Sequence, residues 1–426
     1  MTSMVIDIRR IPSDVREVMD RIARSGYDVW LVGGAVRDLI SGGSPKDWDL
    51  ATSAQPDAVT GLFPVVVPVG IRHGTVLIHT GTHGIETTSY DPDKGITADL
   101  ARRDFTMNAM AVSYPEGRLL DPHGGAEDLR AKLLRAVGDA RSRFSEDPLR
   151  TLRAGRFVAV FGFEIDPDTR DAIRMEARGL SGVAVERIRE ELFKTLMGDE
   201  VLRAFELMHT AGVLKEILPE LVKPGDLTRA RAAHHAPKRL SVRLGALLLG
   251  AMPPRNVEAD ADRREVFGLP RTHVSVPRGI LERLLVPAKL TEEVLFLLHH
   301  PVPSETDRWS DADVRRFIAW VGADRLNDVL DLAHAERSAP LSASREGEAL
   351  NRLDRRIREQ LTGNHPFSLR DLPVGGRDVM EVLGCGPGPA IGRILEELRQ
   401  AALDDPTLND RKILMDFLRE KVHKKD

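Results

Sequence analysis

Two aspartates, Asp47 and Asp49, stand two positions apart in a stretch that has the pattern of a β-strand. Side chains at alternate strand positions point to the same face of a sheet, so both carboxylates would face one site. Paired carboxylate oxygens suit Mg²⁺, and two bridged ions would activate an attacking hydroxyl and stabilise a pyrophosphate leaving group. The pair therefore predicts a magnesium site, with a solvated pair on an exposed strand as the ordinary alternative.

A pair of glycines precedes the aspartates. An apolar strand over 29–32 ends at Gly33 and Gly34, and a short helix that carries Arg37 follows. Glycine lets backbone amides approach a phosphate, and a helix N-terminus adds a favourable dipole. These three residues are therefore predicted to bind the phosphates of a nucleotide. A Gly-Gly turn is weak alone, but this one shares a strand–helix–strand unit with the aspartates.

The elements that must position these residues form a small α/β module followed by helices. A helix over 13–25 has its apolar residues on one face and ends at a glycine. Apolar or alternating segments predict strands at 29–32, 48–51, 65–69, 75–79 and 85–89. From Asp147 onward the pattern is helical, with breaks expected at 253–264, 301–306 and 338–345.

A third motif is Arg102-Arg103-Asp104-Phe105-Thr106-Met107-Asn108-Ala109. It belongs to an ordered series of motifs along the chain, which also contains GGAVRD, KDWD, EDPLR leading into RAGRF, and VERIREELFK. With these motifs, residues 29–195 resemble the class II tRNA nucleotidyltransferase and bacterial poly(A) polymerase family, within the polymerase-β-like superfamily. The resemblance implies an α/β head with a small mixed sheet, followed by an all-helical neck, body and tail. The expected boundaries are 1–140 for the head, 141–200 for the neck, 201–345 for the body and 346–426 for the tail.

The resemblance also implies roles for individual residues. Asp104 would accept a hydrogen bond from the ribose 2′-hydroxyl, and Asn108 would orient the same sugar. Three arginines that recur every three residues on one helical face would line the nucleotide pocket, although a solvated arginine stripe is the alternative. The further nucleotide-binding candidates are these arginines and the two that precede Asp104: Arg150, Arg153, Arg156, Arg102 and Arg103.

In this family the nucleotide template is a carboxylate and an arginine, which here are Asp147 and Arg150. Their i and i+3 spacing predicts that they meet on one face of a helix. A carboxylate accepts hydrogen bonds and a guanidinium donates them, which matches the edges of cytosine and adenine and not those of guanine and uracil. The alternative is an intrahelical salt bridge, which would contribute well under ~1 kcal/mol. Glu186, Arg189 and Glu190 are predicted to brace this helix.

Glu86 is predicted as a third catalytic carboxylate, because its strand would lie beside the one that carries the aspartates. Many bacterial relatives carry a Leu-Leu-His-Asp element after the neck, but this chain reads Leu-Leu-Leu-Gly at 247–250. The body is therefore predicted to be a degenerate, RNA-contacting or structural region and not a phosphohydrolase. In the tail, a glycine-rich turn before a helix over 393–403 is predicted to grip an RNA backbone.

The segment between Tyr90 and Asp99 is short. CCA-adding relatives generally carry a longer loop there, which helps to reshape the pocket from C to A addition. Only eight residues, 91–98, occupy this position. The sequence therefore favours a CC-adding enzyme that uses CTP, with a separate A-adding enzyme to finish the end. The alternatives are a full CCA-adding enzyme that also uses ATP, an A-adding enzyme, a poly(A) polymerase or an inactive RNA-binding module.

Composition sets limits on these functions. The net charge of −4 and the 5% aromatic content argue against bulk charge or a wide stacking surface as the means of RNA binding, so clustered arginines must supply it. The single cysteine, Cys385, excludes an internal disulfide framework and fits a reducing cytoplasm. No export signal or membrane span is apparent. The expected partners are the acceptor stem and 3′ end of tRNA, CTP and Mg²⁺.

Overall fold

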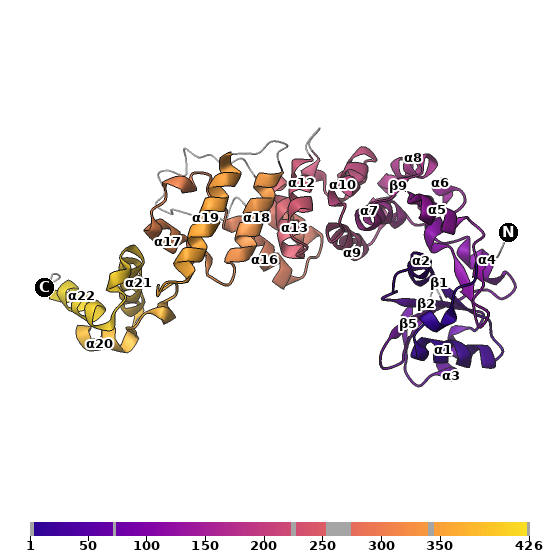
Figure 1. Cartoon of the computed structure of the whole chain (residues 1–426), viewed down its shortest axis with the longest axis horizontal. Coiled ribbons are helices and arrows are strands. Elements are labelled where there is room, and N and C mark those ends of the chain that lie inside the picture. Colours follow the sequence, from indigo (N-terminus) through magenta and orange to yellow (C-terminus); the bar gives the residue numbers. More distant parts are fainter. Residues whose placement is uncertain (1–3, 71–73, 223–226, 253–273, 340–344, 424–426) are drawn as a thin grey trace. The chain divides into compact units, whose positions relative to one another are not determined.

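The computed structural model describes residues 4–70, 74–222, 227–252, 274–339 and 345–423. It divides into two compact units, 1–219 and 220–426, each of which is described here by itself. The elements of the first unit (Figure 1) are α1 (Ser13–Arg24), β1 (Val29–Val32), α2 (Gly34–Ile40), β2 (Trp48–Thr52), α3 (Pro56–Leu62), β3 (Val66–Gly70), β4 (Thr75–His79), β5 (Gly84–Ser89), α4 (Gly95–Leu100), β6 (Ala111–Ser113), β7 (Leu119–Leu120), α5 (Gly125–Ala131), β8 (Leu133–Leu134), α6 (Ala140–Glu146), α7 (Leu149–Phe161), β9 (Glu164–Ile165), α8 (Pro167–Glu176), α9 (Val185–Leu196), α10 (Val201–Thr210) and α11 (Val213–Ile217).

Seven strands form one mixed sheet in the order β3-β4-β5-β2-β1-β6-β7. The pair β2–β5 is parallel and the other neighbours are antiparallel. Leu31, Leu50, Ile78 and Ile85 are fully buried on one face of this sheet, where α1 packs on β1 and α3 on β4. The mixed-sheet head is confirmed, and every predicted strand is present to within a residue at each end.

The opposite face of the sheet carries Asp49 and is covered only in part. An apolar cluster that includes Val32, Ala51, Ile96 and Leu100 packs α4 over β1 and β2. Over β3, β4 and β5 this face is more open, since Glu86 and Val67 are exposed. The catalytic candidates thus lie where the covered and the open parts of the face meet.

The neck contains one departure from all-helical structure. The two-residue strand β9 pairs in parallel with β8, which ties the end of the head to the segment after α7. Phe105 from the head packs edge-on against Phe157 of α7 at 5.4 Å between ring centroids and also lies near Phe144 of α6. These contacts fix α7 against the motif that contains Asp104.

The second unit is helical. Its α-helices are α12 (Thr228–His235), α13 (Leu240–Leu248), α15 (Ser275–Arg283), α16 (Ala288–His299), α17 (Asp311–Val321), α18 (Leu326–Ser338), α19 (Arg345–Leu361), α20 (Gly376–Leu383), α21 (Pro389–Asp404) and α22 (Arg411–His423). The break expected at 301–306 separates α16 from the next helical turn, whereas the break at 253–264 and most of that at 338–345 lie outside the described residues. None of the described helices combines the length and apolar character needed to cross a bilayer.

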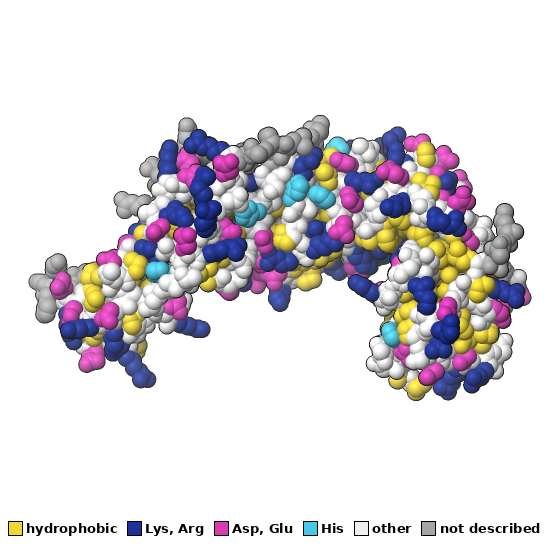
Figure 2. All heavy atoms as spheres, in the orientation of Figure 1, with side chains coloured by type: hydrophobic (Ala, Val, Ile, Leu, Met, Phe, Trp, Pro, Cys, Tyr) yellow, Lys and Arg dark blue, Asp and Glu magenta, His cyan; other side chains and the backbone are white. Residues whose placement is uncertain are grey.

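Basic and acidic side chains are mixed on the face of the described residues that the space-filling view shows (Figure 2). On the face shown in Figure 2, basic and acidic side chains alternate over both units. This agrees with the net charge of −4 and leaves local clusters of arginine as the basic surfaces that matter.

Candidate active site

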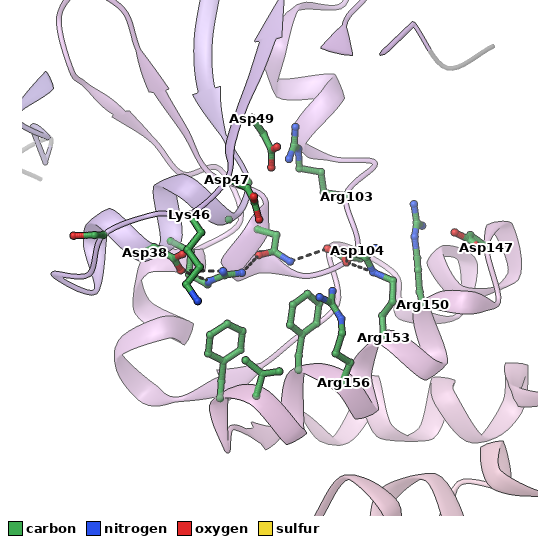
Figure 3. A pocket seen from close by; sticks show the side chains of 18 residues that line it. Asp38, Lys46, Asp47, Asp49, Arg103, Asp104, Asp147, Arg150, Arg153 and Arg156 are labelled. Atoms are coloured by element: carbon green, nitrogen blue, oxygen red, sulfur yellow. Dashed lines mark hydrogen bonds and ion pairs between the residues drawn. The ribbon is translucent and has the colours of Figure 1, made fainter. Parts of the chain in front are cut away.

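A cavity of about 610 Å³ in the first unit lies among α2, the start of β2 and α7. It is lined by all of the predicted site residues except Glu86 and Arg102: Gly33, Gly34, Arg37, Asp47, Asp49, Arg103, Asp104, Asn108, Asp147, Arg150, Arg153 and Arg156. Its wall also contains residues that sequence reasoning did not assign to the site: Asp38, Ser44, Lys46, Phe157, Val160 and Phe161. Figure 3 shows these side chains around one space, with Asp47 and Asp49 on one side and Arg153 and Arg156 of α7 on the other.

The two aspartates point into the same side of the cavity (Figure 3). Asp49 lies in β2, whereas Asp47 lies just before the strand begins at Trp48, so the predicted strand position is wrong for Asp47. The pKa of Asp49 is raised to about 6, mainly by burial and also by the nearby charges of Glu86 and Asp47, against the opposing effect of Arg103. Carboxylates crowded in this way are a donor set whose mutual repulsion a hard divalent cation would relieve.

Glu86 lies directly opposite Asp49 in the parallel register of β2 and β5, but it is exposed and does not line the cavity. Among the described residues, no group of three or more His, Cys, Asp or Glu side chains is placed so that it could hold a metal by itself. A bound ion would therefore need oxygens from water or a triphosphate beside Asp47 and Asp49, which is usual for Mg²⁺. The role of Glu86 as a third ligand stays a prediction.

The glycine turn is shaped by the site. Gly33 has φ +68°, a left-handed conformation that side chains rarely adopt. A Cβ atom there would lie 3.1 Å from Nη1 of Arg103 and 3.3 Å from Oδ2 of Asp49. Glycine is therefore needed at position 33 for the backbone conformation and also for the close approach of the Asp49 and Arg103 side chains.

Arg37 is held before any ligand arrives. Its Nη1 donates to Oδ1 of Asn108 at 2.8 Å, its Nε donates to Oδ1 of Asp38 at 3.0 Å, and its guanidinium lies 4.6 Å from the centre of the Phe161 ring. Only 12% of the side chain is exposed. A pre-positioned guanidinium at the cavity wall is suited to bind phosphate oxygens.

Asp104 is buried and its carboxylate is already hydrogen-bonded. It accepts from Nε of Arg153 at 2.8 Å, from Nδ2 of Asn108 at 3.2 Å and from the backbone N–H of Phe105 at 2.8 Å. Burial alone would raise the pKa of Asp104, but Arg153 and these hydrogen bonds outweigh burial and hold the pKa below its usual value. The carboxylate is therefore charged and available as an acceptor for a sugar hydroxyl.

The arginines of α7 are anchored by α9. Nε of Arg156 lies 2.7 Å from Oε2 of Glu191, which is close enough for an ion pair although the N–H is not aligned for a hydrogen bond. Arg153 lies 3.9 Å from the same carboxylate, and Glu191 is buried. The buried carboxylate that braces the helix is thus Glu191. The bracing role of Glu186, Arg189 and Glu190 stays a prediction, and sequence reasoning did not name Glu191.

The two template candidates line the cavity but do not share a helix, which corrects the i and i+3 prediction. Asp147 has extended backbone torsions between α6 and α7, and Arg150 lies in the first turn of α7. The Asp147 carboxylate accepts from Nη2 of Arg187 at 2.8 Å, so the intrahelical salt bridge is also absent for this pair. Arg150 donates to the carbonyl oxygens of Arg143 and Arg102 at 2.8 and 2.7 Å.

Comparison with known proteins places this geometry in a family. Residues 29–135 match the model of the poly A polymerase head domain, residues 162–223 match the "Probable RNA and SrmB-binding site of polymerase A", and residues 273–418 match domain 2 of tRNA nucleotidyltransferases. The chain is also 31% identical over 424 residues to a CCA-adding enzyme of Geobacillus stearothermophilus, covering 95% of this chain and 96% of that protein.

The chain belongs to the tRNA nucleotidyltransferase and poly(A) polymerase family. It is an RNA nucleotidyltransferase, and enzymes of this family generally use divalent metal ions.

Further relatives agree with this assignment. A CCA-adding enzyme of Geobacillus thermodenitrificans is 38% identical over 301 residues, which cover 66% of this chain and 73% of that protein. The crystal structure of the Bacillus stearothermophilus CCA-adding enzyme in complex with CTP matches 97% of this nucleotidyltransferase and 99% of its own chain, with a TM-score of 0.74 and 27% identity. The Thermotoga maritima CCA-adding enzyme complexed with tRNA shares the fold, with a TM-score of 0.66 at 20% identity.

Proposed function

We propose that this nucleotidyltransferase completes the CCA end of tRNA, using CTP and ATP. The observation that carries the proposal is that Asp47 and Asp49, a glycine turn, Asp104 and the arginines of α7 converge on one cavity. Relatives that align over nearly the whole chain are named CCA-adding enzymes, and these names favour full CCA addition over the CC-only reaction that the sequence favoured.

The proposed reaction forms one phosphodiester bond and breaks one phosphoanhydride bond. The 3′ oxygen of the RNA attacks the α-phosphorus, its proton passes to solvent, and pyrophosphate leaves with the β- and γ-phosphates. Asp47 and Asp49 would hold Mg²⁺, which when bound activates the hydroxyl and offsets charge on the leaving group. The amides of Gly33 and Gly34 together with Arg37 would bind the phosphates.

The remaining side chains would select the nucleotide. Asp104 would accept a hydrogen bond from the ribose 2′-hydroxyl, with Asn108 holding both Asp104 and Arg37 in place. Asp147 and Arg150 would read the base, accepting from the amino group and donating to the ring nitrogen that cytosine and adenine share. The head, neck, body and tail boundaries at 140, 200 and 345 are retained as part of this proposal, as is a cytoplasmic location.

CC-only addition is the second candidate, and one observation favours it. Residues 91–98 do not form a free loop, because Lys94 and Gly95 donate backbone hydrogen bonds to the Asp91 carbonyl and α4 begins at Gly95. A hollow of about 1310 Å³ lies between this turn and the base-reading residues Asp147 and Arg150. Under this second candidate, a turn held in this way would not reshape the base pocket.

One assay separates these candidates. The purified chain is incubated with Mg²⁺ and either tRNA that lacks its last three nucleotides or tRNA that ends in CC, with CTP alone, ATP alone or both. Product ending in CCA at catalytic enzyme concentration supports the proposal, and product that stops at CC supports the second candidate. Addition of a single A only to tRNA ending in CC would indicate an A-adding enzyme, and long A-tails a poly(A) polymerase. Absence of any extension, with RNA binding retained, would indicate an inactive RNA-binding module.

A further inference from the structure

An apolar surface lies on the open part of the sheet, beside the catalytic carboxylates. Val65 and Val67 are 50% and 42% exposed at the β3 edge, and Leu77 on β4 is half-buried between them and β5. We call Val65, Val67 and Leu77 the valine shelf. Exposed apolar side chains are ordinary when scattered, but a contiguous group next to an active site marks a binding surface.

The strand register connects the valine shelf to Asp49. Val67 pairs with Leu77, Leu77 with Glu86, and Glu86 with Asp49, so these four side chains form one row on the same face of the sheet. With about 4.8 Å between neighbouring strands, Val67 lies about 14 Å from Asp49 along this row. The nucleotide pocket lies on the other side of Asp49, under α7, so the shelf extends the site away from the incoming triphosphate.

The shelf is suited to bind a ligand on its face and not a strand at its edge. Pro68 has no N–H to donate, and the register shifts between Pro68 and Gly70, which marks a bulge in β3. Both features discourage pairing of β3 with another strand. The exposed valines therefore need an occupant that packs against side chains.

We propose that the valine shelf receives the nucleobases at the 3′ end of the acceptor RNA, a role that rests on the proposed function. The attacking 3′ oxygen must reach Asp47 and Asp49, and the RNA strand must then leave along a surface that is free. The exposed carboxylate of Glu86 repels phosphates, so the strand lies over Glu86 with its bases toward the sheet. Apolar side chains contact the faces of all four bases, which suits a site that accepts any tRNA.

The test compares Val67→Asp with Val5→Asp in the full-length chain. Val5 is a matched control, because it is 63% exposed and bridges to Arg118 beside β7, at the opposite edge of the same sheet. The KM for tRNA lacking its 3′ end is measured with saturating CTP, and the KM for CTP with saturating tRNA. Val67→Asp is expected to raise the KM for tRNA about tenfold and to leave that for CTP within about twofold, while Val5→Asp changes neither.

A binding measurement tests the role of the valine shelf independently of the proposed function. An RNA with 2-aminopurine as its 3′-terminal base is titrated with each variant, and its fluorescence reports the surroundings of that base without any extension. A Kd about tenfold larger for Val67→Asp than for Val5→Asp supports the binding of RNA to the valine shelf. This holds even if the wild type extends no tRNA, a result that would contradict only the proposed function. Equal values for the two variants in both measurements overturn the shelf.

Val67→Thr guards against a folding defect, because threonine keeps the branched shape and the strand preference of valine. An increase of about threefold in the KM for tRNA is expected, with the thermal unfolding midpoint unchanged. A wild-type KM for tRNA in a folded Val67→Thr protein, together with a folded but unaffected Val67→Asp, would overturn the proposal.

Discussion

The carboxylate of Asp147 is held by Arg187, a residue forty positions along the chain on α9, through contacts of 2.8 and 3.3 Å. Arg150, three positions away, binds backbone carbonyls instead. The carboxylate proposed to read the base is therefore positioned by α9. The arginines proposed to line the nucleotide pocket beside it lie on α7.

Arg187→Ala is expected to weaken selection of the base. Without its partner the Asp147 carboxylate is free to turn, so the ratio of kcat/KM for CTP to that for UTP should fall about tenfold. Stability should change by less than about 1 kcal/mol, because half of the Arg187 side chain is exposed. Arg141→Ala, which removes an exposed pairing with Glu176, is the control and should leave the ratio unchanged. An unaltered ratio in Arg187→Ala would argue against this positioning role.

Asp49→Asn is expected to lower kcat by at least about a thousandfold with Mg²⁺ while binding of tRNA persists. Loss of one carboxylate removes a metal ligand and leaves the arginine pocket intact. Removal of divalent ions from the wild type with EDTA should stop incorporation, and added Mg²⁺ should restore it. Asp57→Asn changes an exposed aspartate of α3 and should behave as wild type. Substantial activity in Asp49→Asn would refute the assignment of this residue as a ligand.

Gly33→Ala and Gly26→Ala separate backbone strain from crowding of the site. Both glycines have positive φ, so each alanine should lower the free energy of unfolding by about 1 kcal/mol. Gly26 has open space where a Cβ would lie, whereas a Cβ at Gly33 would displace Arg103 and Asp49. Activity at 25 °C should therefore fall only in Gly33→Ala. If the two variants lose the same activity, the close approach at Gly33 has no catalytic consequence.

The ion pair between Asp104 and Arg153 should make stability depend on pH. The pKa of Asp104 is lowered in the folded state, so its contribution is fully present above the unfolded value of about 3.9 and is lost as the pH falls through the lower folded value. At pH 7, Asp104→Asn should be less stable by about 2 kcal/mol, a value reduced because a third of the Arg153 side chain is exposed.

Denaturant unfolding of wild type and Asp104→Asn between pH 3 and 7 measures this difference. The difference between the two free-energy curves should narrow as the pH falls below about 3.9, because the carboxyl group of the unfolded wild type takes up protons there before that of the folded state. A constant difference across the whole range would show that the carboxylate charge does not stabilise the fold.

Motif spacing was enough to predict much of the site. The glycine turn and Asp49 lie within one short strand–helix–strand segment whose conformation is local, whereas Asp104 was predicted from the family resemblance. Arg187 and Glu191 were missed because their partners are contributed by packing of α9 on α7, which no local pattern encodes. The aromatic wall of Phe157 and Phe161 resembles an ordinary apolar stripe in the sequence, and only the structure shows the guanidinium groups that lie over it.

One wrong prediction had a signal in the sequence. Asp147 precedes Pro148, and the residue before a proline is disfavoured in the α-helical region because the proline ring clashes with its backbone. The i and i+3 spacing to Arg150 suggested one continuous helix, but the extended torsions of Asp147 end α6 there. The proline was the stronger local rule.

The break between α6 and α7 places Asp147, the residue proposed to read the base, outside both helices. A residue inside α7 would have its torsions fixed by helical hydrogen bonds, whereas Asp147 lies outside both helices and is held by the backbone N–H groups of Leu149 and Arg150 and by Arg187. We expect mutations of Asp147, or of its partner Arg187 on α9, to change the nucleotide preference and to leave the proposed phosphate, ribose and metal contacts as they are.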